Sequence, residues 1–197
     1  MKRAVIFNYN SKFAKDIEKT LLGYNLLHPA DPFEIDIYPY KEFERESDIG
    51  HADVIIHSGG KGRPVKDDIA GVPRIYICHS HEWKAVYSGG KIVQLSGCMK
   101  GVQEIDVLEE DEVLGKKGKL PIMKYHELAI KEPPKNTKVL AVSRAIDSKG
   151  KEIEIIEALR YPDGSTSVQG HPEEGTAAHI FYNHLNKVAS SSLLQPV

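Results

Sequence analysis

The sequence predicts an α/β fold in which a parallel sheet is followed by an antiparallel β section. Three observations predict it. The first half of the chain combines short apolar runs with a helical pattern, the second half holds four more strand candidates with little helix between them, and an amphipathic segment closes the chain. Strands that alternate with helices are typical of a parallel sheet covered on both faces.

The first half supplies one helix and four strands. The apolar run at residues 3–8 (RAVIFN) is typical of a buried strand. Ser11 stands where an N-cap is expected, apolar residues follow at helical spacing, and Gly23 is the predicted C-cap. Three further strands are predicted at residues 33–38, 54–57 and 74–78.

The second half predicts the added antiparallel section. The charged, glycine-bearing stretch 109–119 is expected to be a surface excursion. A last helix is expected to begin near Thr176, and residues 189–197 to form a frayed tail. The whole chain, residues 1–197, is expected to be one domain. The predicted strands of this half are residues 102–108, 138–144, 153–159 and 165–169.

Composition excludes several classes of function. The chain has 26 Lys and Arg against 28 Asp and Glu, and this balance leaves no basic surface for nucleic acid or anionic lipid. No apolar run approaches the ~20 residues of a membrane span, and the N-terminal run is too short for a signal peptide. Two cysteines are too few for a disulfide framework. We therefore expect a cytoplasmic protein with no nucleic-acid and no membrane partner.

Three strand ends carry polar or reactive residues. They are residues 58–62 (SGGKG), 78–82 (CHSHE) and 169–173 (QGHPE). Ligands of open α/β sheets bind outside the carboxyl ends of the strands. Each segment alone is a weak signal, since a cysteine at a strand end is more often a small buried hydrophobe. Their combination in one short chain predicts a shared site.

The chemistry of such a site follows from the residue types. Cys78, between a strand and a helix N-terminus, would have its thiolate stabilised by the helix dipole. A nucleophilic cysteine also needs a base, and His171 suits neutral pH. Glu173 lies two residues later, on the same side of an extended segment, where it could orient that histidine. Backbone N–H groups after Cys78 and in the Gly59-Gly60 turn are candidates to stabilise an oxyanion.

These motifs resemble those of the class I, triad-type glutamine amidotransferases. Ser58-Gly59-Gly60 is similar to the family's S-G-G-P-G turn, and Cys78 to the nucleophile of its G-x-C-x-G-x-Q elbow. Residues 168–173 (VQGHPE) match its V-Q-x-H-P-E signature, the most specific of the motifs. The resemblance covers nearly the whole chain. It implies a flavodoxin-like parallel sheet flanked by helices, with an added antiparallel β section.

The resemblance also implies an enzyme that hydrolyses the side-chain amide of glutamine. Cys78 would attack the amide carbon, His171 would carry the proton to the leaving ammonia, and Glu173 would hold His171. The N–H groups of Gly60 and His79 would form the oxyanion hole. Ammonia would pass to a synthetase subunit on a separate chain, and neither a cofactor nor a metal is expected. The remaining residues expected to contact the substrate are Gly59, Glu82 and His126.

The elbow departs from the family pattern, and the departures keep two alternatives open. Tyr76 and Ser80 stand where the family has glycine, and Glu82 stands where glutamine is usual. Glutamate at this position also occurs in the related γ-glutamyl hydrolases. The chain could therefore be a stand-alone γ-glutamyl peptide hydrolase. It could also be a catalytically weak relative with a binding or regulatory role.

Three further side chains are assigned no metal-binding or nucleophilic role. His79 and His81 are separated by a spacing that does not place both on one helix face, so a metal pair is not expected. Cys98 has neither a helix nor a base beside it in the sequence and is predicted to be structural.

Overall fold

The computed structural model describes residues 2–191 of the chain. Within them the chain forms nine strands, three α-helices and short 3-10 turns. No helix in this described part is both long and apolar enough to cross a membrane. The helices are α1 (Ala14–Leu27), α2 (His79–Tyr87) and α3 (His179–Ser191). The strands are β1 (Lys2–Tyr9), β2 (Phe33–Pro39), β3 (Val54–Gly60), β4 (Arg74–Ile77), β5 (Lys91–Val107), β6 (Gly118–Glu132), β7 (Lys138–Ile146), β8 (Glu152–Arg160) and β9 (Thr166–Val168).

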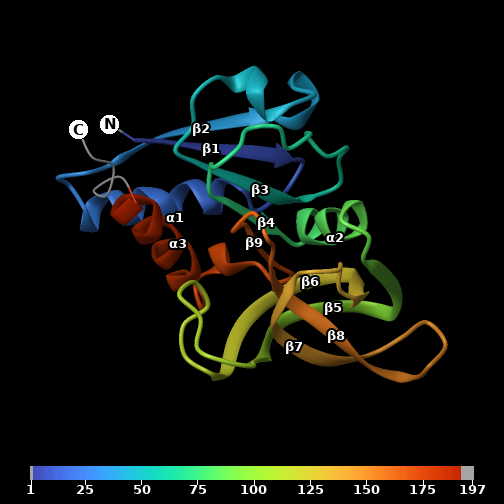
Figure 1. Cartoon of the computed structure of the whole chain (residues 1–197). Helices are drawn as coiled ribbons and strands as arrows, with labels where there is room; N and C mark the ends of the chain where they lie inside the picture. Colours follow the sequence, from blue (N-terminus) through green and yellow to red (C-terminus); the bar gives the residue numbers. More distant parts are fainter. Residues whose placement is uncertain (1, 192–197) are drawn as a thin grey trace.

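All nine strands belong to one sheet with two regions of different character. Five strands pair in parallel in the order β2-β1-β3-β4-β9. β8 then pairs antiparallel to β9, and the order continues through β6 and β5 to β7. β7 pairs back onto β8, so these last four strands close into a small barrel. Figure 1 shows the barrel strands at one end of the molecule and the parallel strands at the other.

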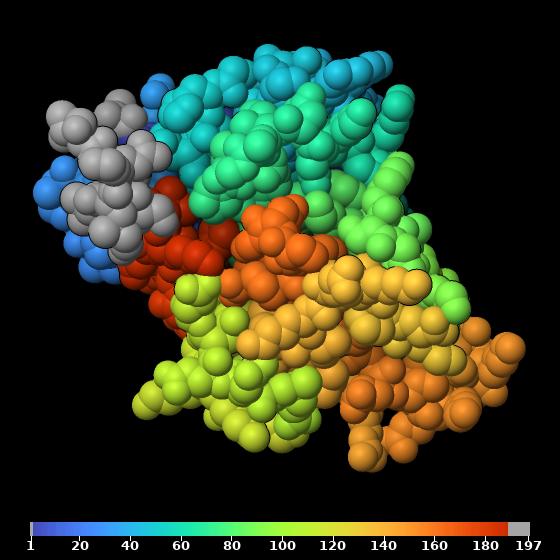
Figure 2. All heavy atoms as spheres, viewed as in Figure 1, coloured from blue at the N-terminus to red at the C-terminus, as the bar shows by residue number. Residues whose placement is uncertain are grey.

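The mixed α/β content predicted from the sequence is confirmed, and the predicted antiparallel section is present but closes into a barrel. The antiparallel strands are the longest in the molecule, with 17 residues in β5 and 15 in β6. They continue the same sheet beyond β9 and close into a barrel through the pairing of β7 with β8. In the space-filling view, residues of the barrel (yellow-green to orange) fill the whole lower part of the molecule (Figure 2).

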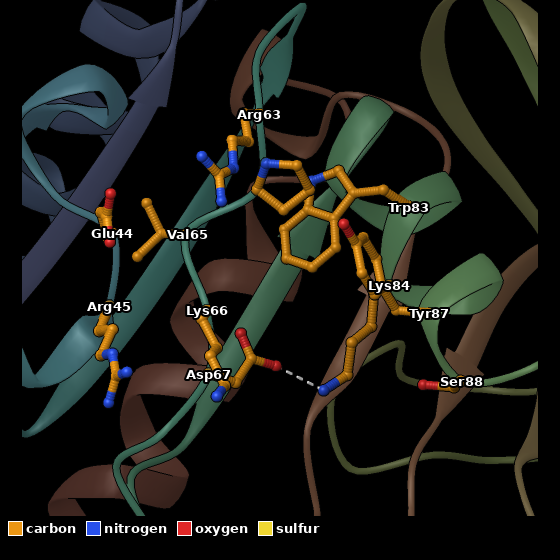
Figure 3. A pocket seen from close by; sticks show the side chains of 11 residues that line it. Glu44, Arg45, Arg63, Val65, Lys66, Asp67, Trp83, Lys84, Tyr87 and Ser88 are labelled. Carbon is orange, nitrogen blue, oxygen red and sulfur yellow. Dashed lines mark hydrogen bonds and ion pairs between the residues drawn. The ribbon is translucent and has the colours of Figure 1, made fainter.

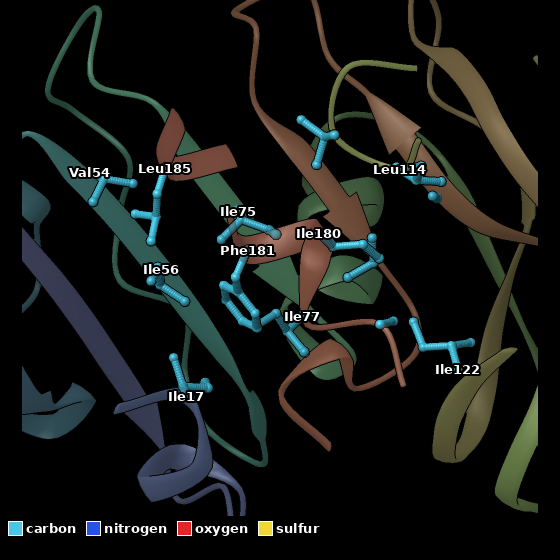
Figure 4. Packing of buried hydrophobic residues seen from close by; sticks show 14 of the residues in the cluster. Ile17, Val54, Ile56, Ile75, Ile77, Leu114, Ile122, Ile180, Phe181 and Leu185 are labelled. Carbon is cyan, nitrogen blue, oxygen red and sulfur yellow. The ribbon is translucent and has the colours of Figure 1, made fainter. Parts of the chain in front are cut away.

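One face of the parallel strands packs against two helices. Ala4 and Ile6 of β1 point to this face, where they join Ile17 of α1 and Phe181 of α3 in the main hydrophobic cluster. Figure 4 shows this cluster continuing past α3 to Ile122 of the barrel. The helices therefore bind the parallel strands and the barrel into one core.

The opposite face has a different cover. Val5 and Phe7 alternate with the residues above and join a second cluster, because successive side chains of a strand point to opposite faces. The cover here consists of the irregular segments before and after β3, including Val65, together with Trp83 of α2. A helix on each face was expected from the alternation of elements, whereas most of this face is covered by turns.

The two ends of α1 differ from the prediction. The helix begins after Phe13 and not at Ser11, whose hydroxyl oxygen accepts a hydrogen bond from the Phe13 N–H at 3.1 Å. It also runs through Gly23, the predicted C-cap, to Leu27. A Cβ at Gly23 would lie 3.0 Å from the Tyr182 hydroxyl oxygen, so this glycine serves a close approach between α1 and α3.

The other predictions in the second half vary in accuracy. The strands expected there are all present, with β5, β7 and β8 longer than predicted and β9 shorter. β6 has no predicted counterpart. α3 starts at His179, three residues later than expected, and continues to Ser191. The remainder of the predicted frayed tail, residues 192–197, lies outside the described residues.

Candidate active site

The elbow at Cys78 joins β4 to α2. Cys78 has φ +51° and ψ −110°, a strained conformation for a residue with a side chain, which costs about 1–3 kcal/mol. Its N–H donates to the Val168 carbonyl at 2.8 Å, and its Sγ lies 3.7 Å from the Tyr125 carbonyl oxygen. The backbone N–H of His79, at the start of α2, donates toward the sulfur. The turn thus holds a largely buried thiol against the N-terminus of a helix.

His171 and Glu173 come into direct contact. The Nδ1 atom of His171 lies 2.9 Å from Glu173 Oε1, and both side chains are buried. The His171 N–H donates to the Met123 carbonyl of the barrel at 2.7 Å. The Phe13 ring lies 4.3 Å from the imidazole, centroid to centroid. The histidine is thereby fixed by its own loop, by the barrel and by the start of α1.

Gly59 lies beside both Cys78 and His171. A Cβ built on it would be 3.2 Å from Cys78 Cβ and 3.1 Å from His171 Cε1. The two side chains therefore flank one narrow space at the end of β3. Gly60 follows with φ +114°, and a Cβ there would lie 2.2 Å from the Tyr9 carbonyl oxygen. Only glycine permits this approach of the turn to the end of β1.

Burial and nearby charges control the protonation of the thiol. Burial raises the pKa of Cys78 well above its ordinary value, and the carboxylates of Glu82 and Glu173 raise it further. The His79 N–H acts in the opposite direction but does not overcome them. Cys78 is therefore a neutral thiol at neutral pH. A base must remove its proton before the sulfur can act as a nucleophile.

Glu82 lies on the first turn of α2 and is buried. Its Oε1 accepts a hydrogen bond from Gln169 Nε2 at 2.9 Å, and its Oε2 lies 3.8 Å from His79 Nδ1. This interaction with Glu82 raises the pKa of His79. Gln169 was part of the matched motif, but no role at the site was predicted for it.

His126 lies on β6, one residue beyond the carbonyl that approaches the thiol. It is buried, its Nδ1 pairs with the Leu128 carbonyl at 2.7 Å, and burial lowers its pKa. Among the described residues, its Nε2 has no hydrogen-bond partner. The ring is therefore neutral at neutral pH and has one nitrogen available for a further bond.

The two irregular elbow residues both have defined partners. The Tyr76 ring stacks on His57 with centroids 4.5 Å apart, and its hydroxyl donates to Asp67 at 2.5 Å. Ser80 donates from its hydroxyl to the Ser58 carbonyl at 2.5 Å. Tyr76 thus points to the face away from the main cluster, and Ser80 ties α2 to the glycine turn. The bulk of Tyr76 is accommodated without crowding Cys78.

Neither group of possible metal ligands is arranged for a metal. His79 bonds the Gly62 carbonyl at 3.1 Å, whereas the fully buried His81 bonds Ser167 and the Ile156 carbonyl, so these two rings have different partners. Ligand atoms of three residues behind the elbow do gather within 4.8 Å, but cationic side chains already pair with two of them. The three residues are Glu46, His57 and Asp67.

The structure also corrects the assignment of Cys98. This cysteine is exposed on β5 and takes no part in the core, so it is not a buried structural residue. Phe13 and Tyr125, by contrast, were not predicted at the site. Phe13 follows the apolar spacing of α1, and Tyr125 contributes a carbonyl, so neither leaves a signal in the sequence.

Comparisons with known proteins find one matching family, one similar sequence and similar solved structures. A family model described as Glutamine amidotransferase class-I matches residues 22–187. One subunit of the glutamine-hydrolysing GMP synthase of Pyrococcus abyssi (strain GE5 / Orsay) is 34% identical over 114 residues. That match covers 57% of this chain and 56% of the relative, so it spans little more than half the relative's length.

Two solved structures share the fold. A protein from Thermoplasma acidophilum, provisionally assigned as one subunit of a GMP synthase, superposes with a TM-score of 0.77 at 15% identity. The superposition covers 99% of this chain and 98% of that one. The glutaminase domain of Trypanosoma brucei CTPS with bound acivicin gives 0.71 at 12% identity, over 96% and 94% of the two chains.

Proposed function

The chain belongs to the class I glutamine amidotransferase family, and we propose that it is a cytoplasmic enzyme that hydrolyses the side-chain amide of glutamine through a thioester on Cys78. The observation that carries the proposal is the narrow space beside Gly59. Cys78 and His171 both border it, and Glu173 pairs with the Nδ1 atom of the imidazole. A nucleophile, a base and the group that orients the base are the parts that acyl transfer requires.

The first step forms the thioester. His171 takes the thiol proton of Cys78 on Nε2, because its Nδ1 faces Glu173. The sulfur forms a bond to the amide carbon of glutamine, and the carbonyl oxygen becomes an oxyanion. His171 then gives its proton to the amide nitrogen, the carbon–nitrogen bond breaks, and ammonia leaves. The raised pKa of Cys78 makes this proton transfer a required part of the step.

The second step returns the free enzyme. A water molecule gives a proton to His171 and attacks the thioester carbon, and the sulfur leaves to recover that proton as a thiol. Glutamate is released. In both steps the N–H groups of His79 and Gly60 would stabilise the oxyanion. Support comes from the position of the His79 N–H at the sulfur and from the conformation of Gly60, which lets the backbone approach closely.

The partner is proposed to be a synthetase subunit on another chain. The Pyrococcus relative is named as one subunit of a glutamine-hydrolysing GMP synthase. We therefore propose that ammonia from this enzyme is used by a synthetase of that kind. Gly59, Glu82 and His126 are proposed to contact the glutamine, and the free Nε2 of His126 supports a hydrogen bond to substrate.

A second candidate is hydrolysis of γ-glutamyl peptides. The observation that favours it is Glu82, whose buried carboxylate stands beside Cys78 in place of the glutamine that is usual in the family. A negative charge there would attract the α-ammonium group of a substrate and repel its α-carboxylate. The bond broken in this case would join the γ-carbonyl to a peptide nitrogen, with the same roles for Cys78 and His171.

One assay separates these candidates. Ammonia release from glutamine and cleavage of a γ-glutamyl dipeptide are measured with the parent enzyme, with Cys78→Ala, and with Cys98→Ala as the matched cysteine control. Ammonia release that is lost only in Cys78→Ala supports the glutaminase, and turnover of the dipeptide alone supports the second candidate. If neither substrate is turned over and a glutamine-like electrophile leaves Cys78 unlabelled, the chain is a binding or regulatory relative.

A further inference from the structure

A pocket of about 600 Å³ lies on the outer side of α2. It is formed by the second half of that helix and by two irregular segments on either side of β3, residues 44–45 and 63–67 (Figure 3). This volume is within the range of small-molecule sites, about 300–1,000 Å³. Neither Cys78, His171 nor Glu173 lines the pocket, so it is separate from the active site.

The charge of the pocket is predominantly positive. Arg45, Arg63, Lys66 and Lys84 line it, against two carboxylates, those of Glu44 and Asp67. Asp67 is already paired, because Lys84 Nζ lies 2.6 Å from it. In the part of the chain that the structure describes, neither Arg63 nor Lys66 forms an ion pair.

A third carboxylate, that of Asp68, lies near the rim of the pocket. Hydrogen bonds from Ser47 lower its pKa, and the charges of Arg45 and Lys66 lower it further. Among the described residues, no carboxylate lies within ion-pair distance of Arg63. The cationic excess is therefore concentrated on Arg63, with Lys66 adding to it.

Aromatic side chains supply the other wall. Trp83 is half-buried, and its ring meets that of Tyr87 edge to face with centroids 5.9 Å apart. Tyr87 is 76% exposed, so most of its ring is open to solvent. In the view of Figure 3, the Trp83 ring lies between Arg63 and the Lys84–Asp67 pair. A flat apolar surface thus adjoins a cationic one.

The base of the pocket is already fixed by the protein. Asp67 receives a hydrogen bond from Tyr76 at 2.5 Å as well as the ion pair with Lys84. Trp83 also packs edge to face on Tyr76, with centroids 5.6 Å apart. A ligand would therefore need to order little beyond the ends of Arg63 and Lys66.

We propose that this pocket binds an aromatic phosphate, of the class of aryl or nucleoside monophosphates. The planar ring lies against Trp83 and Tyr87, the phosphate accepts hydrogen bonds from Arg63, and Lys66 adds its positive charge. Guanidinium and ammonium groups are the usual partners of phosphate, and aromatic faces the usual partners of bases. Because Trp83 and Lys84 belong to the helix that begins beside Cys78, the bound ligand would also contact the element that carries the elbow.

The test uses phenyl phosphate as the probe, with inorganic phosphate and phenol as the two halves of the ligand. Trp83 is the only tryptophan of the chain, so tryptophan fluorescence reports on the surroundings of this one ring in the pocket wall. Calorimetry on the same solutions gives the affinity. We expect a saturable change in Trp83 emission with phenyl phosphate, and binding of inorganic phosphate and of phenol at least about tenfold weaker.

Matched variants locate the site. Arg63→Gln/Lys66→Gln should weaken phenyl phosphate binding at least about tenfold, because the charge-assisted contact of Arg63 and the positive charge of Lys66 are both lost. Lys149→Gln/Lys151→Gln, which removes two exposed cations at the turn between β7 and β8, should leave the affinity unchanged. The proposal is overturned if phenyl phosphate does not bind, if inorganic phosphate binds equally well, or if both double variants behave alike. None of these outcomes depends on glutaminase activity, so the proposed function is tested separately.

Discussion

Replacing Gly59 with alanine should place a methyl group in the space between nucleophile and base. The new Cβ would lie 3.1 Å from His171 Cε1 and 3.2 Å from Cys78 Cβ. Carbon atoms prefer about 3.5–4.0 Å, so one or both side chains must move by several tenths of an ångström. Gly59 is not among the residues with positive φ, so the alanine backbone itself is unstrained. The change therefore acts on the separation of the two proposed catalytic groups.

The expected loss of activity is large compared with the loss of stability. A misplacement of about 1 Å can cost about 100-fold in rate, so we expect kcat for ammonia release to fall about 10- to 100-fold. Overpacking costs about 1–3 kcal/mol, and the lower entropy of the unfolded chain returns up to about 1 kcal/mol of that. The free energy of unfolding should therefore fall by no more than about 3 kcal/mol, as measured with urea.

Gly97→Ala is the matched control. A Cβ at Gly97 meets no atom within 4 Å, so both the rate and the stability should stay close to those of the parent. The reasoning is refuted if Gly59→Ala keeps the parent rate, because the thiol and the imidazole would then not depend on this space. It is also refuted if the loss of rate only matches a loss of folded protein.

Three further changes test the charges around the site and in the barrel. Glu173→Gln removes the charge that orients the His171 imidazole, so kcat at saturating glutamine should fall at least about 100-fold, and a loss under about tenfold would contradict the assigned role. Glu82→Gln removes a charge that raises the pKa of Cys78, so that pKa should fall and iodoacetamide should label the thiol at lower pH; an unchanged pH profile would argue against the contact. Lys124→Met leaves the Glu157 carboxylate buried without its ion-pair partner at 2.5 Å, so the free energy of unfolding in urea should fall by about 3–5 kcal/mol. The double variant Lys124→Met/Glu157→Leu should restore most of that stability. Equal instability of the single and double variants would show that the pair is not the cause.

The parallel strands could be predicted because their signal is local. Both faces of β1, β3 and β4 are buried, so each reads as a continuous apolar run. The polar residues that end β3 and β4 were equally visible, and the structure brings Gly59, Cys78 and His171 together. In these segments the local pattern and the tertiary environment agree.

β6 could not be predicted, because its inward-facing positions change character along the strand. Leu120 and Ile122 are followed at the same spacing by Lys124 and His126, and all four are buried. The expected alternation of apolar and polar residues therefore ends midway. The burial of Lys124 depends on Glu157 of β8 and Ser143 of β7, which bond its ammonium group. Such a pairing is non-local and leaves no pattern in the sequence of β6.

The contacts of Gln169 and Phe13 were missed for a similar reason. Gln169 reaches Glu82 across 87 positions of the chain, and Phe13 reaches His171 from the other end of the sequence. The glycine at position 23 likewise serves a close approach to Tyr182 of α3 and not the end of α1. Each of these features is set by a partner that is distant in sequence.

The position of β8 has a consequence for how the protein loses its structure. β8 pairs with β9 of the parallel region and also with β6 and β7 of the barrel. β9 has only three residues, and His171 follows it closely while hydrogen-bonded to β6. The barrel therefore cannot open without releasing the hydrogen bond that fixes the backbone of His171. Both regions should melt in one cooperative transition, with no populated state that keeps the parallel sheet and the active site after the barrel has unfolded.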